Sequence, residues 1–125
     1  MSVTDLPALE LGFAGTPLRQ RLVDAVLRGE KTATAGLLDQ HESLPVVGER
    51  CLLLGFADEP LAIVETTEVR VLRVSDVDLE FARDEGEGFQ SVAEWRAAHE
   101  EFWAGIAVRD DTLVVAERFT VVERF

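Results

Sequence analysis

The sequence predicts an α+β domain built on a mostly antiparallel sheet that is curved or barrel-like. Residues 61–74 are dense in β-branched side chains, which favours one long strand. Strand candidates outnumber helix candidates in the second half of the chain. These candidates are not separated by regular helices. A doubly wound parallel sheet needs strands that alternate with helices, so it is not expected here.

The first expected element is a helix over residues 18–28. Thr16 supplies a hydroxyl cap, and Pro17 suits the first helical position. Apolar side chains then recur at helical spacing, and Gly29 is the expected stop signal.

The stretch after this helix holds Lys31, the only lysine in the chain. A buried lysine, unlike an arginine, can lose its proton and act as a base or nucleophile. Thr34 follows three positions later, so the two side chains can meet on a helical turn or in a folded-back loop. A base beside a hydroxyl is the minimal pattern for an activated nucleophile. The alternative is a solvated lysine in a helix-to-strand turn, with threonines starting a strand.

Strands are expected at four further places. Residues 50–56 and 61–74 flank an acidic turn, which indicates a hairpin. Residues 112–116 and 118–122 read as two final strands, with Glu117 between them.

Two helices are expected between the long strand and the final strands. The first is short and covers residues 78–84, and an acidic, glycine-containing loop follows it. Ser91 is a good cap for the second helix, and Glu94 completes a capping box. This helix is expected to run to about residue 104.

Composition fits a single domain over residues 1–125, since 47% of the residues are hydrophobic. No apolar run is long enough to cross a bilayer, and the N-terminal residues lack the pattern of a signal peptide. We therefore expect a cytoplasmic protein with no membrane partner. Cys51 is the only cysteine, which excludes an internal disulfide.

The net charge of −12 argues against non-specific binding of nucleic acid, because such binding depends on cations that neutralise phosphates. Arg19, Arg21, Arg28 and Lys31 nevertheless fall in one short window. They form either a local basic face or the solvated face of the first helix.

The sequence predicts neither a metal nor a cofactor. His41 and His99 are far apart and match no metal-ligand spacing. Phosphate-binding glycine loops and the serine-hydrolase elbow are absent as well.

The remaining polar candidates gather between residues 85 and 99. Glu85 and Glu87 are charges of a solvated loop or of a ligand site. Arg96 and His99 share a helix face and suit either an internal ion pair or a ligand contact. Trp95 lies on the same helix and either packs in the core or stacks on a base.

Five segments together resemble the ASCH domain family. They are Gly-Glu-Lys-Thr-Ala-Thr-Ala from residue 29, Leu-Pro-x-Val-Gly from 44, Ala-Ile-Val-Glu-Thr-Thr-Glu-Val from 62, Phe-Ala-x-x-Glu-Gly-Glu-Gly from 81 and Glu-Trp-Arg-x-x-His from 94. Residues 117–122 fit the family's last strand. The resemblance spans about residues 11–122 and is specific as a set.

The resemblance implies a PUA-like fold, which is a small β-barrel with helices at its rim. It also implies RNA or a nucleotide- or nucleoside-like small molecule as partner, bound in a cleft between barrel and helices. The expected ligand-binding residues are Gly29, Thr32, Glu87, Trp95, Arg96 and His99.

Some ASCH-like proteins are amidohydrolases that remove the acetyl group of N4-acetylcytidine. They use a lysine, a threonine three residues later and a distant glutamate. By this resemblance the catalytic set is Lys31, Thr34 and Glu85, with Glu87 and Glu65 as alternatives for the carboxylate.

One position departs from the amidohydrolases, because Gly36 stands where they carry an arginine. Two alternatives to that activity follow from the same family. The first is a non-catalytic RNA-binding module, and the second is a ribonuclease in which His99 and Lys31 act as acid and base.

Overall fold

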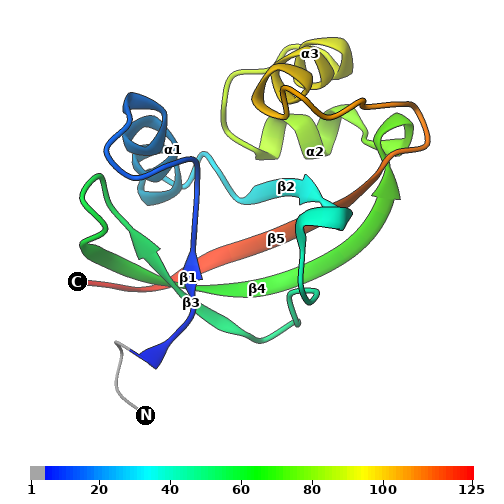
Figure 1. Cartoon of the computed structure of the whole chain (residues 1–125). Coiled ribbons are helices and arrows are strands. Elements are labelled where there is room, and N and C mark those ends of the chain that lie inside the picture. The colour runs from blue at the N-terminus through cyan, green and yellow to red at the C-terminus, as the bar shows by residue number, and fades with distance from the viewer. Residues whose placement is uncertain (1–4) are drawn as a thin grey trace.

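The computed structural model describes residues 5–125, which form a five-stranded sheet with helices packed on it (Figure 1). The strands lie in the order β1-β3-β4-β5-β2. β1 pairs with β3 in parallel, and every other neighbouring pair is antiparallel. The strands are β1 (Ala8–Leu9), β2 (Ala33–Leu37), β3 (Arg50–Leu54), β4 (Pro60–Arg73) and β5 (Leu113–Arg124). The helices are α1 (Pro17–Leu27), α2 (Leu79–Asp84) and α3 (Val92–Phe102), with single 3-10 turns η2 (Leu38–Gln40) and η3 (Val74–Asp76).

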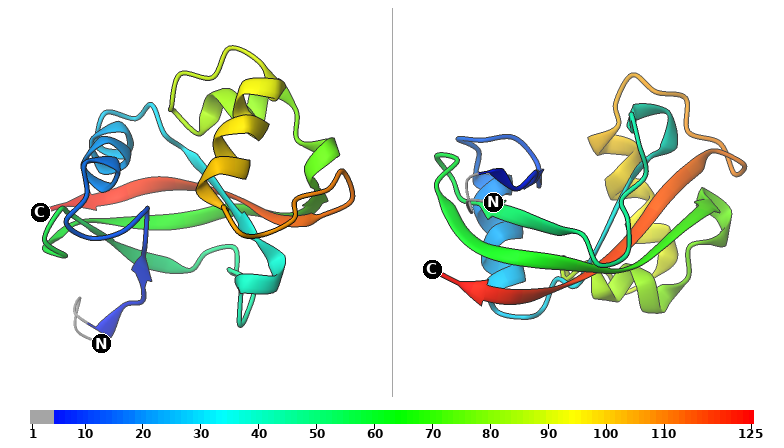
Figure 2. Two further views of the ribbon diagram at one scale, coloured as in Figure 1. Left: turned by 45° about the horizontal axis from the view of Figure 1, so that its top comes forward. Right: turned by 90° about the horizontal axis from the view of Figure 1, so that it is seen from below.

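The expected α+β class with a mostly antiparallel sheet is confirmed, but the closed barrel is wrong. β1 and β2 are the two ends of the sheet and do not pair with each other. Closure would need a first strand that can pair on both sides. β1 has two residues and pairs only with β3. The sheet curves instead, as the long strands in Figure 2 show.

The expected break at Glu117 is also wrong, because β5 runs through this residue as one strand. Glu117 lies opposite Thr34 of β2 on one side and Val69 of β4 on the other. Pairing on both sides satisfies the backbone there, so a polar side chain does not end the strand. The register of β4 against β5 shifts near Ile63 and again between Thr66 and Glu68, and such irregularities bend a sheet.

The helix boundaries follow the local signals in the sequence. The side chains of Thr16, Asp78 and Ser91 cap α1, α2 and α3, each accepting a backbone hydrogen bond. The capping box at α3 is half formed. The Glu94 carboxylate accepts from the backbone N–H of Gln90 and not from that of Ser91.

Two apolar clusters hold the helices on the sheet. α1 contributes Val23 and Val26 to a cluster with Leu53, Val64 and Phe119. The second cluster joins α2 and α3 to the far ends of β2 and β5, and it includes Phe81, Trp95, Trp103, Ala33 and Val114. Figure 1 shows α1 and the α2/α3 pair over different ends of the sheet, with the connection from α1 to β2 running between them. Within the described chain, no helix combines the length and apolar character of a membrane span.

Candidate functional site

Lys31 lies in the turn between α1 and β2, and backbone hydrogen bonds fix that turn at both ends. Gly29 has a φ of 79°, a conformation that favours glycine, where the chain leaves α1. The N–H groups of Glu30 and Lys31 both donate to the Ala25 carbonyl, at 2.9 and 3.1 Å. The Thr32 N–H donates to the carbonyl of Asp84 in α2, at 2.7 Å. Hydrogen bonds therefore hold the turn to α1 and to α2.

Gly86 brings the loop after α2 onto this turn. Its φ is 70°, and a Cβ placed on it would lie 2.6 Å from both the Glu30 carbonyl carbon and the Lys31 nitrogen. Only glycine fits that approach without moving the backbone. The close contact places Glu85 and Glu87, on either side of Gly86, against the lysine.

The Lys31 side chain is buried, with 2% of its surface exposed. Its ammonium donates to the carbonyl of Ala33 at 2.9 Å and to that of Glu85 at 3.2 Å. Nζ also lies 3.7 Å from Glu85 Oε1 and 3.7 Å from Glu87 Oε2. The lysine is thus a donor held between two carboxylates, and not the solvated lysine of the alternative reading.

Glu85 is equally buried and connects three side chains. One carboxylate oxygen faces Lys31, and the other accepts the indole N–H of Trp95. That second oxygen also lies 3.4 Å from His99 Nε2. The other ring nitrogen of His99 is 2.8 Å from the carbonyl of Trp95, one turn earlier in α3. Lys31, Glu85, Trp95 and His99 therefore form one connected group, here called the Lys31 cluster.

The pKa of His99 is raised above its usual value of 6.5. Burial alone lowers it, but the hydrogen bond to Glu85 and the charge of that carboxylate, assisted by the Trp95 carbonyl and Glu87, outweigh burial. The imidazole stacks on the Trp95 ring, with centroids 4.2 Å apart. Its protonated form is therefore favoured by a carboxylate on one edge and an aromatic face beside it.

A cleft of about 420 Å³ lies beside the Lys31 cluster. α1 and its C-cap residue provide Arg21, Asp24 and Arg28 on one wall, here called the α1 wall, and Glu87 and Phe89 lie on the other. Glu87 is the link between cleft and cluster, because its side chain is 27% exposed and its carboxylate is 3.7 Å from Lys31 Nζ. Gly29, Thr32 and Lys31 border a second, smaller cavity of about 200 Å³ near the end of β5.

Glu85, Glu87 and His99 are the one group in the described part of the chain whose ligand atoms lie close enough to hold a metal ion, within 4.8 Å of one another. The ammonium of Lys31 already supplies a positive charge 3.7 Å from both carboxylates. The lysine therefore neutralises one of the two carboxylate charges, and we assign no metal to the group.

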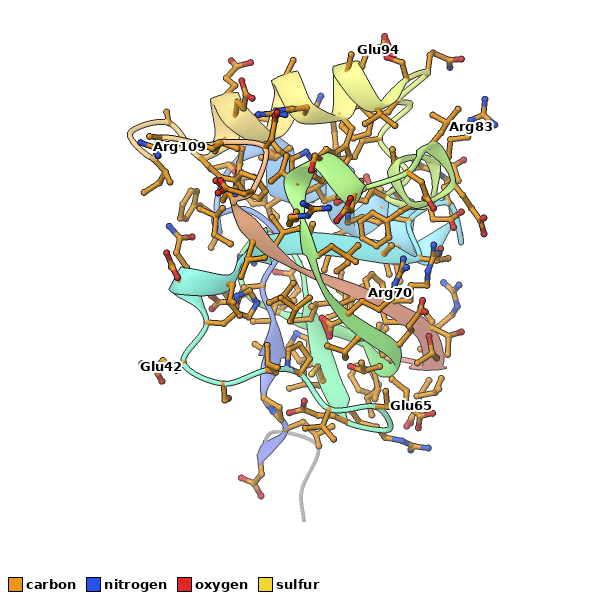
Figure 3. The ribbon with its side chains drawn as sticks, turned by 90° about the vertical axis from the view of Figure 1, so that its right-hand side faces the viewer. Glu42, Glu65, Arg70, Arg83, Glu94 and Arg109 are labelled. Atoms are coloured by element: carbon orange, nitrogen blue, oxygen red, sulfur yellow. The ribbon has the colours of Figure 1, made fainter. Side chains whose placement is uncertain are left out.

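Thr34, Arg96 and Glu65 contact neither the Lys31 cluster nor the cleft beside it. Thr34 is in β2 opposite Glu117, and it alternates with Ala33 and Ala35, which pack against the α2/α3 core. It therefore points to the other face of the strand. Arg96 forms ion pairs with Glu100 and Asp110. Glu65 pairs with Arg50 and lies far from α3, as its label and that of Glu94 show in Figure 3.

A second buried polar pair was not predicted from the sequence. The hydroxyl of Thr66 donates to Glu117 at 3.1 Å, and burial raises the pKa of the Glu117 carboxyl. Near it, the ring of His41 covers Gly36, where a Cβ would lie 2.7 Å from His41 Cε1. The two partners of the pair are 51 positions apart, so no local spacing signalled it.

Together, the sheet, the helices and the cleft lined by Glu87 define a small α+β domain with a polar ligand-sized cleft. The model of the ASCH domain family matches residues 11–123, so the chain belongs to that family. The family resemblance seen in the sequence is therefore confirmed.

Solved structures agree with this assignment. The crystal structure of an ASCH domain from Lactobacillus crispatus is 36% identical, with a TM-score of 0.75 over 83% of this chain and 72% of that chain. A protein from Enterococcus faecalis is 29% identical, with a TM-score of 0.82 over 94% and 77%. ASCH from Zymomonas mobilis, 13% identical with a TM-score of 0.54 over 81% and 64%, shares the fold alone. No curated protein sequence matched the chain.

Proposed function

We propose that this ASCH-domain protein binds a nucleoside- or nucleotide-like ligand in the cleft between α1 and residues 86–89. The position of Glu87 carries the proposal, because this side chain both lines the cleft and lies 3.7 Å from Lys31 Nζ. The cleft therefore ends in a charged group and offers Phe89 as an apolar wall. Its volume of about 420 Å³ suits a small ligand. A cytoplasmic location, as the composition suggests, is part of the proposal.

The proposal extends to hydrolysis of an amide on a modified nucleoside such as N4-acetylcytidine. Glu87 takes a proton from water as the water oxygen attacks the acetyl carbonyl. Glu87 then returns that proton to the departing exocyclic amine, which gives acetate and cytidine. Both oxygens of Glu85 already face donors, so Glu85 positions Lys31 and His99. The carboxylate in contact with the ligand is thus Glu87, two residues from the best sequence candidate.

Water replaces Thr34 as the nucleophile in this scheme. The reason is the alternation along β2, which turns Thr34 away from the face that packs on α2 and α3. In the described structure no hydrogen bond joins Thr34 to Lys31, whose ammonium donates to carbonyls instead. Thr34→Val is therefore expected to keep its turnover.

The test is release of acetate and cytidine from N4-acetylcytidine by the purified protein. Wild type and Thr34→Val are expected to turn over, and Glu87→Gln is expected to bind the compound without releasing acetate. Glu65→Gln is the matched control, because Glu65 is a carboxylate that pairs with Arg50 and does not line the cleft. Binding without turnover by wild type removes the hydrolysis step, and absence of binding contradicts the proposal as a whole.

Binding of RNA without turnover is the second candidate, favoured by the two arginines on the α1 wall of the cleft. It predicts affinity for a short single-stranded RNA that falls as salt concentration rises. Cleavage of the same RNA would instead indicate the ribonuclease. That activity draws on Lys31 and His99, which contact the two oxygens of one carboxylate.

A further inference from the structure

The two walls of the cleft differ in chemistry. Arg21 and Asp24 lie on α1 and Arg28 caps its C-terminus; the spacings of three and four positions place them on one face of the helix. The facing wall carries the Phe89 ring and the Glu87 carboxylate. A ligand that spans the cleft therefore meets an aromatic ring and an acceptor on one side and guanidinium groups on the other.

Arg21 stands out among these groups. The protein has 24 acidic residues, yet within residues 5–125 no carboxylate forms an ion pair or hydrogen bond with the Arg21 guanidinium. Its neighbour Asp24 accepts from Gln20 instead, at 2.9 Å. Arg28 pairs with Glu30 at 3.1 Å, but both side chains are more than half exposed. An exposed pair of this kind contributes little and exchanges readily for another anion.

We propose that the α1 wall is the subsite for a phosphate group, so that the preferred ligand of the cleft is a nucleoside monophosphate. This inference rests on the proposed function and adds the ligand class. Arg21 binds the phosphate oxygens through its guanidinium fork, with Arg28 as the second cation. Phe89 packs against the base, and Glu87 accepts a hydrogen bond from an amino group on it.

A single phosphate fits better than a polyanion. The cleft walls carry two arginines and two carboxylates, Asp24 and Glu87. The chain as a whole has a net charge of −12, which repels an extended phosphate backbone. A monophosphate places its charge against Arg21 and leaves the acidic wall to the amino-bearing base.

The experiment is a calorimetric comparison of cytidine and cytidine 5′-monophosphate as probes. Wild type is expected to bind the monophosphate about tenfold more tightly, as one charge-assisted contact provides. Arg21→Gln is expected to lose this gain and keep its affinity for cytidine. Arg109→Gln is the matched control, since Arg109 also lacks a carboxylate partner in the described structure and lies on another surface (Figure 3).

Two results would overturn the inference while the proposed function stands. One is equal affinity of wild type for cytidine and its monophosphate. The other is a phosphate gain that Arg21→Gln retains or that Arg109→Gln loses equally. If neither compound binds, the proposed function fails together with the inference. Tighter binding of a 5′-phosphorylated RNA than of the free monophosphate would overturn the choice of a mononucleotide.

Discussion

Lys31 and Glu85 are joined twice. The Lys31 ammonium lies 3.7 Å from the Glu85 carboxylate and donates a hydrogen bond to the Glu85 backbone carbonyl at 3.2 Å. Both side chains are almost fully buried. A buried charge without its partner is costly, so each of these residues depends on the other.

Removing one partner of this pair should destabilise the protein strongly. Lys31→Met leaves the Glu85 carboxylate buried beside Glu87 without its cation, at a cost of about 3–5 kcal/mol. The double variant Lys31→Met/Glu85→Gln is expected to lose less than the sum of the two single variants, because no uncompensated charge remains. Urea unfolding of the four proteins measures this coupling. Additive losses would show that the two charges do not interact.

Gly86 is predicted to be required for both its conformation and its close approach to the Lys31 turn. A non-glycine residue in the left-handed conformation costs about 1–2 kcal/mol. Gly86→Ala should destabilise the protein by more than this, because the new Cβ also meets the Glu30 carbonyl. Gly88→Ala is the control. Gly88 also has a positive φ, but open space surrounds it, so it should lose the conformational part alone. Equal losses in urea unfolding would contradict the close contact.

Protonation of His99 should stabilise the fold. Its pKa is raised in the folded state, above the usual 6.5, so this stabilisation is fully present below 6.5 and is lost as pH rises through the folded value. The free energy of unfolding should therefore fall as the pH rises above 6.5, and less so in His99→Gln. The imidazole proton signals should titrate above 6.5 in wild type and lower in Glu85→Gln. An unchanged His99 titration in that variant would refute the role of Glu85.

The charged form of Glu117, unlike that of His99, should destabilise the fold. Burial raises the pKa of this carboxyl above 4.5, so ionising it weakens the fold as pH rises from 4.5 through the folded value. Glu117→Gln keeps an oxygen to accept from Thr66 and removes the charge. The variant is expected to be more stable than wild type near pH 7, with the difference shrinking toward about pH 4. Chemical denaturation at both pH values checks this, and a variant less stable at neutral pH would contradict it.

Local features of the fold were predictable from the sequence, and long-range ones were not. The helix starts at Thr16 and Ser91 depend on residues within one turn, and they were predicted correctly. The continuity of β5 through Glu117 depends on partners 48 and 83 positions away, Val69 and Thr34. The openness of the sheet likewise depends on how short β1 is, which no periodicity indicates.

The sequence indicated which residues gather at the candidate site, but not the separate role of each. The family resemblance associated Lys31 with a carboxylate near residue 85, and the fold brings these residues together. The separate roles of Glu85 and Glu87 follow from burial, which differs between two residues on either side of Gly86. The hydrogen bond from the Trp95 indole to the Glu85 carboxylate depends on how α3 packs on α2, and no sequence pattern predicts it.

The most direct test of the account is to map where a nucleoside binds. Backbone amide chemical shifts of the full chain should be recorded as N4-acetylcytidine is added. The account predicts shifts at Arg21, Glu87, Phe89 and Ala98, which line the cleft. Glu42 and Glu65, on distant surfaces (Figure 3), should stay unchanged. Absence of shifts, or shifts confined to the region of Glu42 and Glu65, would contradict it.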